Sequence, residues 1–96
     1  MQMSEEKVFV VVRTILLESY PAFNISMDTF LDYGETNCLF MSSIEIVEFI
    51  VKLEKAFDIV IDFNERYYTV RDVVHSVVSY LNEKDEVVLE DVSNES

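Results

Sequence analysis

The sequence contains little glycine, proline, cysteine and histidine, and each shortage excludes a class of protein or site. One Gly and one Pro in 96 residues argue against a glycine-rich phosphate loop and against a flexible linker. The single Cys38 cannot form a disulfide within the chain, and no Cys and His residues have the spacing of a metal site. We therefore expect no metal centre and a reducing, cytoplasmic setting.

Basic residues are also scarce. Seven Lys and Arg stand against 19 Asp and Glu, which gives a formal net charge of −12. Such a charge repels nucleic acid and anionic membranes, and it attracts basic partners over long distances. The longest unbroken apolar run, Val8 to Val12, is far shorter than the roughly 20 residues of a membrane-spanning helix. The first residues do not resemble a signal peptide. We expect neither a nucleic-acid partner nor a membrane span.

The chain does have abundant apolar residues in helical spacing. Half of its residues are hydrophobic, which is enough for one packed domain. The spacing predicts helices over residues 4–19, 43–57 and 69–81, although the β-branched residues 10–12 would also suit a strand. Ser4 is a suitable N-cap for the first helix, and Thr69 with Asp72 resembles a capping box for the last.

The remaining segments differ in character. The apolar residues within 20–42 show no helical or strand periodicity, but this segment is too apolar for an exposed linker. We interpret it as an ordered crossover packed across the core. From Glu83 onward the chain carries six acidic residues and one lysine. We therefore predict a domain at residues 1–83 and an acidic, flexible tail at residues 84–96.

Catalytic residues are hard to find in this sequence. The only histidine, His75, falls on the side of its predicted helix away from the valine stripe, where a solvated surface position is expected. Cys38 lacks the sequence neighbours of an activated thiol and is more typical of a buried small hydrophobe. Neither residues 28–35 nor residues 58–65 have the alternating ligands of a calcium-binding EF-hand loop. We predict that the protein is not an enzyme.

The helix predicted over residues 43–57 has the clearest pattern. Its core stripe consists of Ile46, Phe49, Ile50, Leu53 and Phe57. A second apolar row, formed by Ile44, Val47 and Val51, makes the apolar arc wider than one core face requires. Such an arc either packs against another element or stays exposed for a partner.

Two adjacent serines, Ser42 and Ser43, stand at the start of this helix. One interpretation is an N-cap serine that accepts hydrogen bonds from unpaired amides, and spacing alone favours it. The other is an attachment point, because a hydroxyl at a helix N-terminus projects into solvent beside amides that favour an anionic group. A phosphodiester would be well placed there.

Residues 41–54, MSSIEIVEFIVKLE, resemble the signature of acyl carrier proteins around the serine that bears phosphopantetheine. The family commonly reads Leu-Gly-x-Asp-Ser-Leu, followed by acidic and apolar positions. This chain has Leu39, Ser43 and Ile44 in that register, but Phe40 stands in place of the Gly and Ser42 in place of the Asp.

The resemblance continues on both sides of this signature. Asp28-Thr29-Phe30-Leu31 is similar to the loop that follows the family's first helix. Thr69-Val70-Arg71-Asp72-Val73-Val74 is similar to the family's Thr-Val-x-Asp-Ala-Val fourth helix. The resemblance therefore covers about residues 5–82.

This resemblance implies an all-α fold, a four-helix bundle with a long first loop and a short third helix. It implies a discrete, non-catalytic carrier whose Ser43 bears a covalent 4'-phosphopantetheine and holds acyl intermediates as thioesters, in polyketide or specialised fatty acid biosynthesis. Its partners would be a phosphopantetheinyl transferase, a ketosynthase and other acyl-processing enzymes with basic docking patches. The docking residues would be Ile44, Glu45, Val47, Glu48, Val51 and Glu54.

Two alternatives remain open at this point. Aminoacyl and peptidyl carriers belong to the same family, but they usually carry Gly-Gly before the serine region, which this chain lacks. An acidic helical interaction module without a prosthetic group would use Ser43 only as a helix cap.

Overall fold

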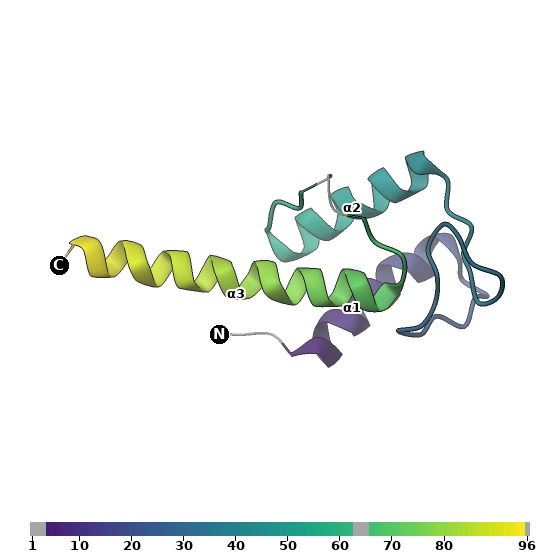
Figure 1. Ribbon diagram of the computed structural model, residues 1–96, viewed down its shortest axis with the longest axis horizontal. Helices are drawn as coiled ribbons and strands as arrows, with labels where there is room; N and C mark the ends of the chain where they lie inside the picture. The colour runs from purple at the N-terminus through teal and green to yellow at the C-terminus, as the bar shows by residue number, and fades with distance from the viewer. Residues whose placement is uncertain (1–3, 63–65, 96) are drawn as a thin grey trace.

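The described residues form three helices: α1 (Glu5–Ser19), α2 (Ser43–Phe57) and α3 (Val70–Glu95) (Figure 1). The computed structural model describes residues 4–62 and 66–95, with the side chains of residues 4–62 and 66–83. Within these residues there are isolated β-bridges and no strands, so the predicted all-α class is confirmed. No helix formed by the described residues is long and apolar enough to cross a bilayer.

Side-chain hydrogen bonds cap the N-termini of α1 and α3. The Ser4 hydroxyl accepts a hydrogen bond from the Lys7 amide at 3.4 Å, with Glu5 and Glu6 in the first turn of α1. At α3, the Thr69 hydroxyl accepts from the Asp72 amide at 3.3 Å, and the Asp72 carboxylate accepts from the Thr69 amide at 3.1 Å. Both predicted N-termini are confirmed.

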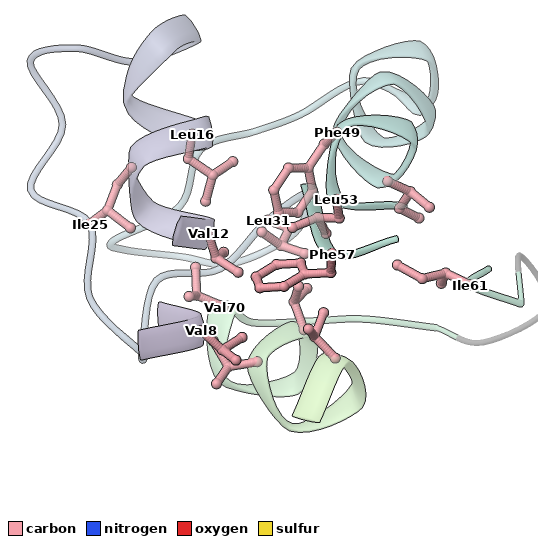
Figure 2. Packing of buried hydrophobic residues seen from close by; sticks show 14 of the residues in the cluster. Val8, Val12, Leu16, Ile25, Leu31, Phe49, Leu53, Phe57, Ile61 and Val70 are labelled. Carbon is pink, nitrogen blue, oxygen red and sulfur yellow. The ribbon is translucent and has the colours of Figure 1, made fainter. Parts of the chain in front are cut away.

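The core lies where α1 packs against both α2 and α3 (Figure 2). The helices bury Val8, Val12 and Leu16 of α1, Phe49, Ile50, Leu53 and Phe57 of α2, and Val70, Val73, Val74 and Val77 of α3. Each fully buried Val or Leu contributes roughly 1.5–3 kcal/mol relative to an exposed one. The β-branched residues 10–12 are therefore helical. Val10 and Val12 would lie on the same face of a strand, but Val12 is 0% exposed and Val10 is 59% exposed.

Residues 20–42 form the predicted ordered crossover. They bury Ile25, Leu31, Leu39 and Met41 in the same core. The Leu39 amide donates to the Phe30 carbonyl and the Met41 amide to the Leu31 carbonyl, both at 2.9 Å. The Val70 amide donates to the Thr29 carbonyl, also at 2.9 Å. Residues 29–31 therefore hold the residues that precede α2 against the start of α3.

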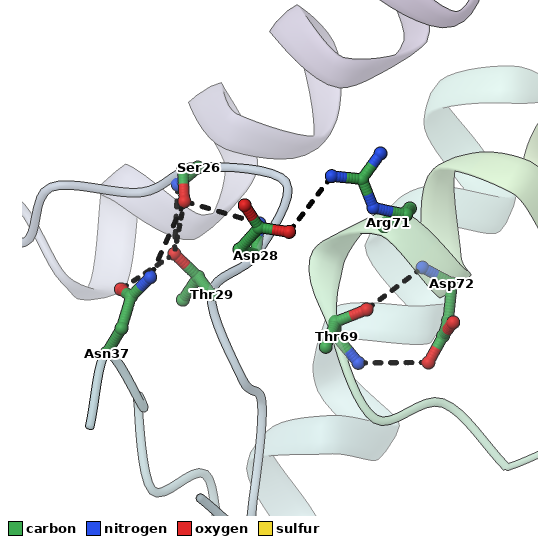
Figure 3. Close-up of polar contacts among 7 residues, drawn as sticks. All are labelled: Ser26, Asp28, Thr29, Asn37, Thr69, Arg71 and Asp72. Atoms are coloured by element: carbon green, nitrogen blue, oxygen red, sulfur yellow. Dashed lines mark hydrogen bonds and ion pairs between the residues drawn. The ribbon is translucent and has the colours of Figure 1, made fainter. Parts of the chain in front are cut away.

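A polar cluster inside the crossover fixes its shape (Figure 3). Thr29 is 0% exposed, and its hydroxyl accepts from the Ser26 amide at 2.9 Å and donates to the Asn37 side-chain oxygen at 3.0 Å. An ion pair of 2.9 Å between Arg71 and Asp28 joins the same loop to the first turn of α3. The buried Thr29 hydroxyl thus has both a donor and an acceptor as partners, as a buried polar group requires.

The segment after α2 differs from the resemblance. Residues 59–62 and 66–68 are not helical, so the described residues contain no short third helix, and residues 63–65 lie outside the described part. The physical reason is an alternation of burial: Ile59 and Ile61 are buried, whereas Val60 between them is 82% exposed. The Ile61 amide donates to the Glu54 carboxylate at 2.8 Å, which holds this extended piece against α2.

The last helix is longer than the predicted one. The spacing predicted its end near residue 81, but the backbone of α3 continues to Glu95 without a break at residue 84. Side chains beyond residue 83 lie outside the described part, and the division into a domain and a flexible tail stays a prediction.

We predict that Thr29→Val destabilises the protein although it preserves the volume of the side chain. The variant leaves the Ser26 amide and the Asn37 side-chain oxygen without their partner, at a cost of about 1–3 kcal/mol in the free energy of unfolding. Thermal unfolding measures the loss. Thr36→Val, at an exposed position of the same loop, is the matched control and should change little. Equal melting temperatures for the two variants would contradict the role given to Thr29.

Candidate functional site

The N-terminus of α2 is capped by Ser42. Its hydroxyl accepts from the Glu45 amide at 3.2 Å, and the Glu45 carboxylate accepts from the Ser42 amide at 3.1 Å, so the two residues form a reciprocal capping box. The backbone of Ser42 is extended, with φ −75° and ψ 168°. The cap that the sequence suggested is therefore Ser42, and capping does not account for Ser43.

Ser43 is the first residue of α2 and is exposed. In the part of the chain that the structure describes, its hydroxyl has no hydrogen-bond partner. A residue at this position lies beside the amides of the first helical turn, which have no partner inside the helix. Ser43 thus presents an unengaged hydroxyl to solvent at the positive end of the helix dipole.

Glu45 links this helix start to the end of α1. One carboxylate oxygen accepts from the Ser42 amide, and the other accepts from the Tyr20 hydroxyl just beyond α1. The hydrogen bond from Tyr20, followed by those from Ser42, lowers the pKa of Glu45 below its ordinary value. Burial and then the bond to Glu45 raise the pKa of Tyr20 to about 12. Glu45 therefore orders the helix start that carries Ser43.

The other predicted docking residues divide into two groups. Ile44 is 71% exposed and Val47 is 47% exposed, and Glu48 beside them is also exposed. Val51 and Glu54 are only partly exposed, and the Glu54 carboxylate is engaged by the Ile61 amide. The exposed part of the predicted strip is thus the N-terminal half of α2, next to Ser43.

A small cavity of about 30 Å³ lies between α1 and α2, lined by Leu16, Tyr20, Met41, Glu45 and Phe49 among others. A single water needs about 10–15 Å³ of such space, so this cavity has room for two or three waters. The pair formed by Tyr20 and Glu45 belongs to its wall.

Residues considered for catalysis lie elsewhere in the fold. Cys38 is buried in the crossover, as predicted. His75 is exposed on α3, also as predicted, and its Nε2 lies 3.1 Å from a carboxylate oxygen of Glu5 on α1. Among the residues that the structure describes, no three His, Cys, Asp or Glu side chains form a group that could hold a metal ion.

The sequence reasoning missed two residues near Ser43. Tyr20 was not connected with Glu45, because 25 residues separate them along the chain. Phe40 was noted only as a replacement for Gly, yet its ring is 67% exposed and its φ is 54°. The Gly in the family's motif was the available signal for this positive φ.

The bond between Tyr20 and Glu45 makes stability depend on pH in a predictable way. The pKa of Tyr20 is raised from 10.0 to about 12. The stability that the Tyr20 hydroxyl adds to the folded protein is therefore complete below pH 10 and is lost as pH rises to 12. The pKa of Glu45 is lowered, so its contribution is lost as pH falls through that lowered value.

We predict that the wild type is more stable than Tyr20→Phe near neutral pH and that this difference shrinks toward both extremes. Denaturant unfolding across the pH range measures it. Tyr33→Phe, at an 81% exposed tyrosine of the crossover, should follow the wild type throughout. A difference between wild type and Tyr20→Phe that is independent of pH would show that the hydroxyl does not bind Glu45 in solution.

Comparison of the chain with protein-family models, with curated proteins and with solved structures finds no match. Function must therefore be inferred from the side chains at the start of α2. Those side chains are an unengaged serine hydroxyl, a capping box that leaves it unengaged, and exposed apolar and acidic neighbours.

Proposed function

We propose that the protein is a discrete acyl carrier protein that bears 4'-phosphopantetheine on Ser43 and presents acyl groups to separate enzymes. One observation supports this most strongly: Ser42 caps α2 and Ser43, exposed and first in the helix, does not. The Ser42 in place of the family's Asp still supplies an oxygen for the cap. This cap supports the proposal, because it forms the kind of helix start that the resemblance implies.

The surroundings of Ser43 fit a phosphodiester. Its position at the N-terminus of α2 favours an anion through the helix dipole and the first-turn amides. The nearest carboxylate in sequence, Glu45, has its oxygens directed at the Ser42 amide and the Tyr20 hydroxyl. When bound, the arm supplies a terminal thiol that carries the acyl group as a thioester.

Partner enzymes must cover the surface around Ser43 to reach such an arm. Ile44 and Val47 supply exposed apolar area, and Glu48 supplies an exposed charge beside it. A net charge of −12 favours enzymes with basic docking patches, including the transferase and a ketosynthase, and speeds their encounter. The proposed pathway is polyketide or specialised fatty acid biosynthesis.

An interaction module without a prosthetic group is the second candidate, because exposed Ile44 and Val47 would serve binding whether or not Ser43 is modified. An aminoacyl or peptidyl carrier would use Ser43 in the same way and would differ in the group that it carries. Modification of Ser43 separates both kinds of carrier from the module.

We predict that Ser43→Ala abolishes modification while Ser42→Ala does not. The protein is incubated with coenzyme A and a phosphopantetheinyl transferase, and its intact mass is measured. Ser42→Ala removes the cap of α2 and should lower the free energy of unfolding by about 1 kcal/mol, yet it should still gain the mass of the arm. The reverse pattern would place the arm on Ser42, and an unmodified wild type would favour the interaction module.

We predict that Glu48→Lys slows modification by the transferase, and more so at low salt, because an exposed charge acts mainly on the association rate. The effect should be at most about fivefold, equivalent to about 1 kcal/mol. The rate is measured over a series of salt concentrations. Glu83→Lys, which makes the same change in net charge at an exposed position of α3, is the matched control. Equal slowing by both variants would assign the effect to net charge alone.

A further inference from the structure

Phe40 occupies a backbone conformation that does not suit it. Three residues other than glycine have positive φ among the described ones: Asn37 at 51°, Phe40 at 54° and Asp58 at 53°. Asn and Asp adopt the left-handed region readily because their short polar side chains form local hydrogen bonds. A phenylalanine gains no such bond, and a glycine would adopt this φ without strain.

The fold requires the turn at this position but does not require an aromatic ring. Leu39 and Met41 are 7% and 6% exposed, and their amides are bound to the carbonyls of Phe30 and Leu31. These contacts fix the backbone on both sides of Phe40 and leave its ring 67% exposed. Since the ring contributes little burial and adds strain, its presence is better explained by a contact outside the chain.

The exposed ring is one of three large apolar side chains that surround Ser43 in sequence. Phe40 precedes the cap by two residues, and Ile44 and Val47 lie one turn apart on α2, with exposures of 71% and 47%. We name these three exposed residues, grouped by their nearness in sequence, the Phe40 patch. Glu48, next to Val47, adds an exposed negative charge at its border.

We propose that Phe40 is the anchor of a protein docking surface, and that its ring enters an apolar pocket that is rimmed by Lys and Arg on the partner. Charge identifies this occupant. A second copy of the chain would bring a net charge of −12 and another Glu48 against this surface, and would be repelled. A partner with a basic rim complements both the patch and its border. Naming that partner an acyl-processing enzyme or transferase rests on the proposed function.

The docking surface can be tested without a prosthetic group. The probe is a synthetic amphipathic helix with leucine on one face and lysine along its edges, titrated into isotopically labelled full-length protein. We expect saturable amide shifts centred on residues 40–48 that weaken with salt and with Phe40→Gly. A peptide of the same composition in scrambled order should cause smaller and unsaturated shifts. Shifts that centre on exposed Val60 and Tyr68 instead, or that persist in Phe40→Gly, would overturn the proposal.

A second measurement connects Phe40 to the proposed function. Phe40→Gly should melt a few degrees higher than wild type, because the strain is relieved, and yet lose about tenfold in kcat/KM for modification by the transferase. Tyr33→Ala removes another exposed aromatic of the crossover and should leave the rate unchanged. Unchanged modification of Phe40→Gly would overturn the anchor role. An unmodified wild type would instead reject the carrier function, and the peptide titration would then decide the role of Phe40 by itself.

Discussion

Residues 29–31 connect the parts of the chain that begin the second and third helices. Their carbonyls accept from Leu39 and Met41 on one side and from Val70 on the other, and the Leu31 amide donates to the Tyr68 carbonyl. The buried Thr29 hydroxyl keeps the loop in the shape that these bonds require. The position of Ser43 relative to α1 and α3 thus depends on a crossover without regular secondary structure.

Neighbouring residues at the start of α2 have different roles. Ser42 satisfies the helix end, Glu45 completes that cap and binds Tyr20, and Ser43 is left exposed. Glu45 makes structural bonds with its carboxylate, Glu48 is also exposed, and the docking role of both residues stays a prediction. The attachment that we propose would use this arrangement, since Ser43 would carry its arm into solvent from a capped helix end.

The structure of the crossover restricts the residue type at Gly34 and at Phe40 for two different reasons. A Cβ at Gly34 would lie 2.7 Å from the ring of Phe30, so close packing requires glycine there. At Phe40 the backbone favours glycine through its positive φ, and yet a large exposed ring is present. Packing explains the first residue, and for the second we propose an interaction outside the chain.

The sequence by itself determined the features that depend on near neighbours. Ser4, Thr69 and Asp72 identified helix starts, and the spacing of Phe49, Ile50, Leu53 and Phe57 identified the buried face of α2, because caps and helical faces are set within four residues. Only the tertiary structure decided which apolar row stays exposed, why Ile59 and Ile61 bury from an extended segment, and that Tyr20 binds Glu45. These outcomes depend on contacts between residues far apart in the chain, for which local spacing carries no signal.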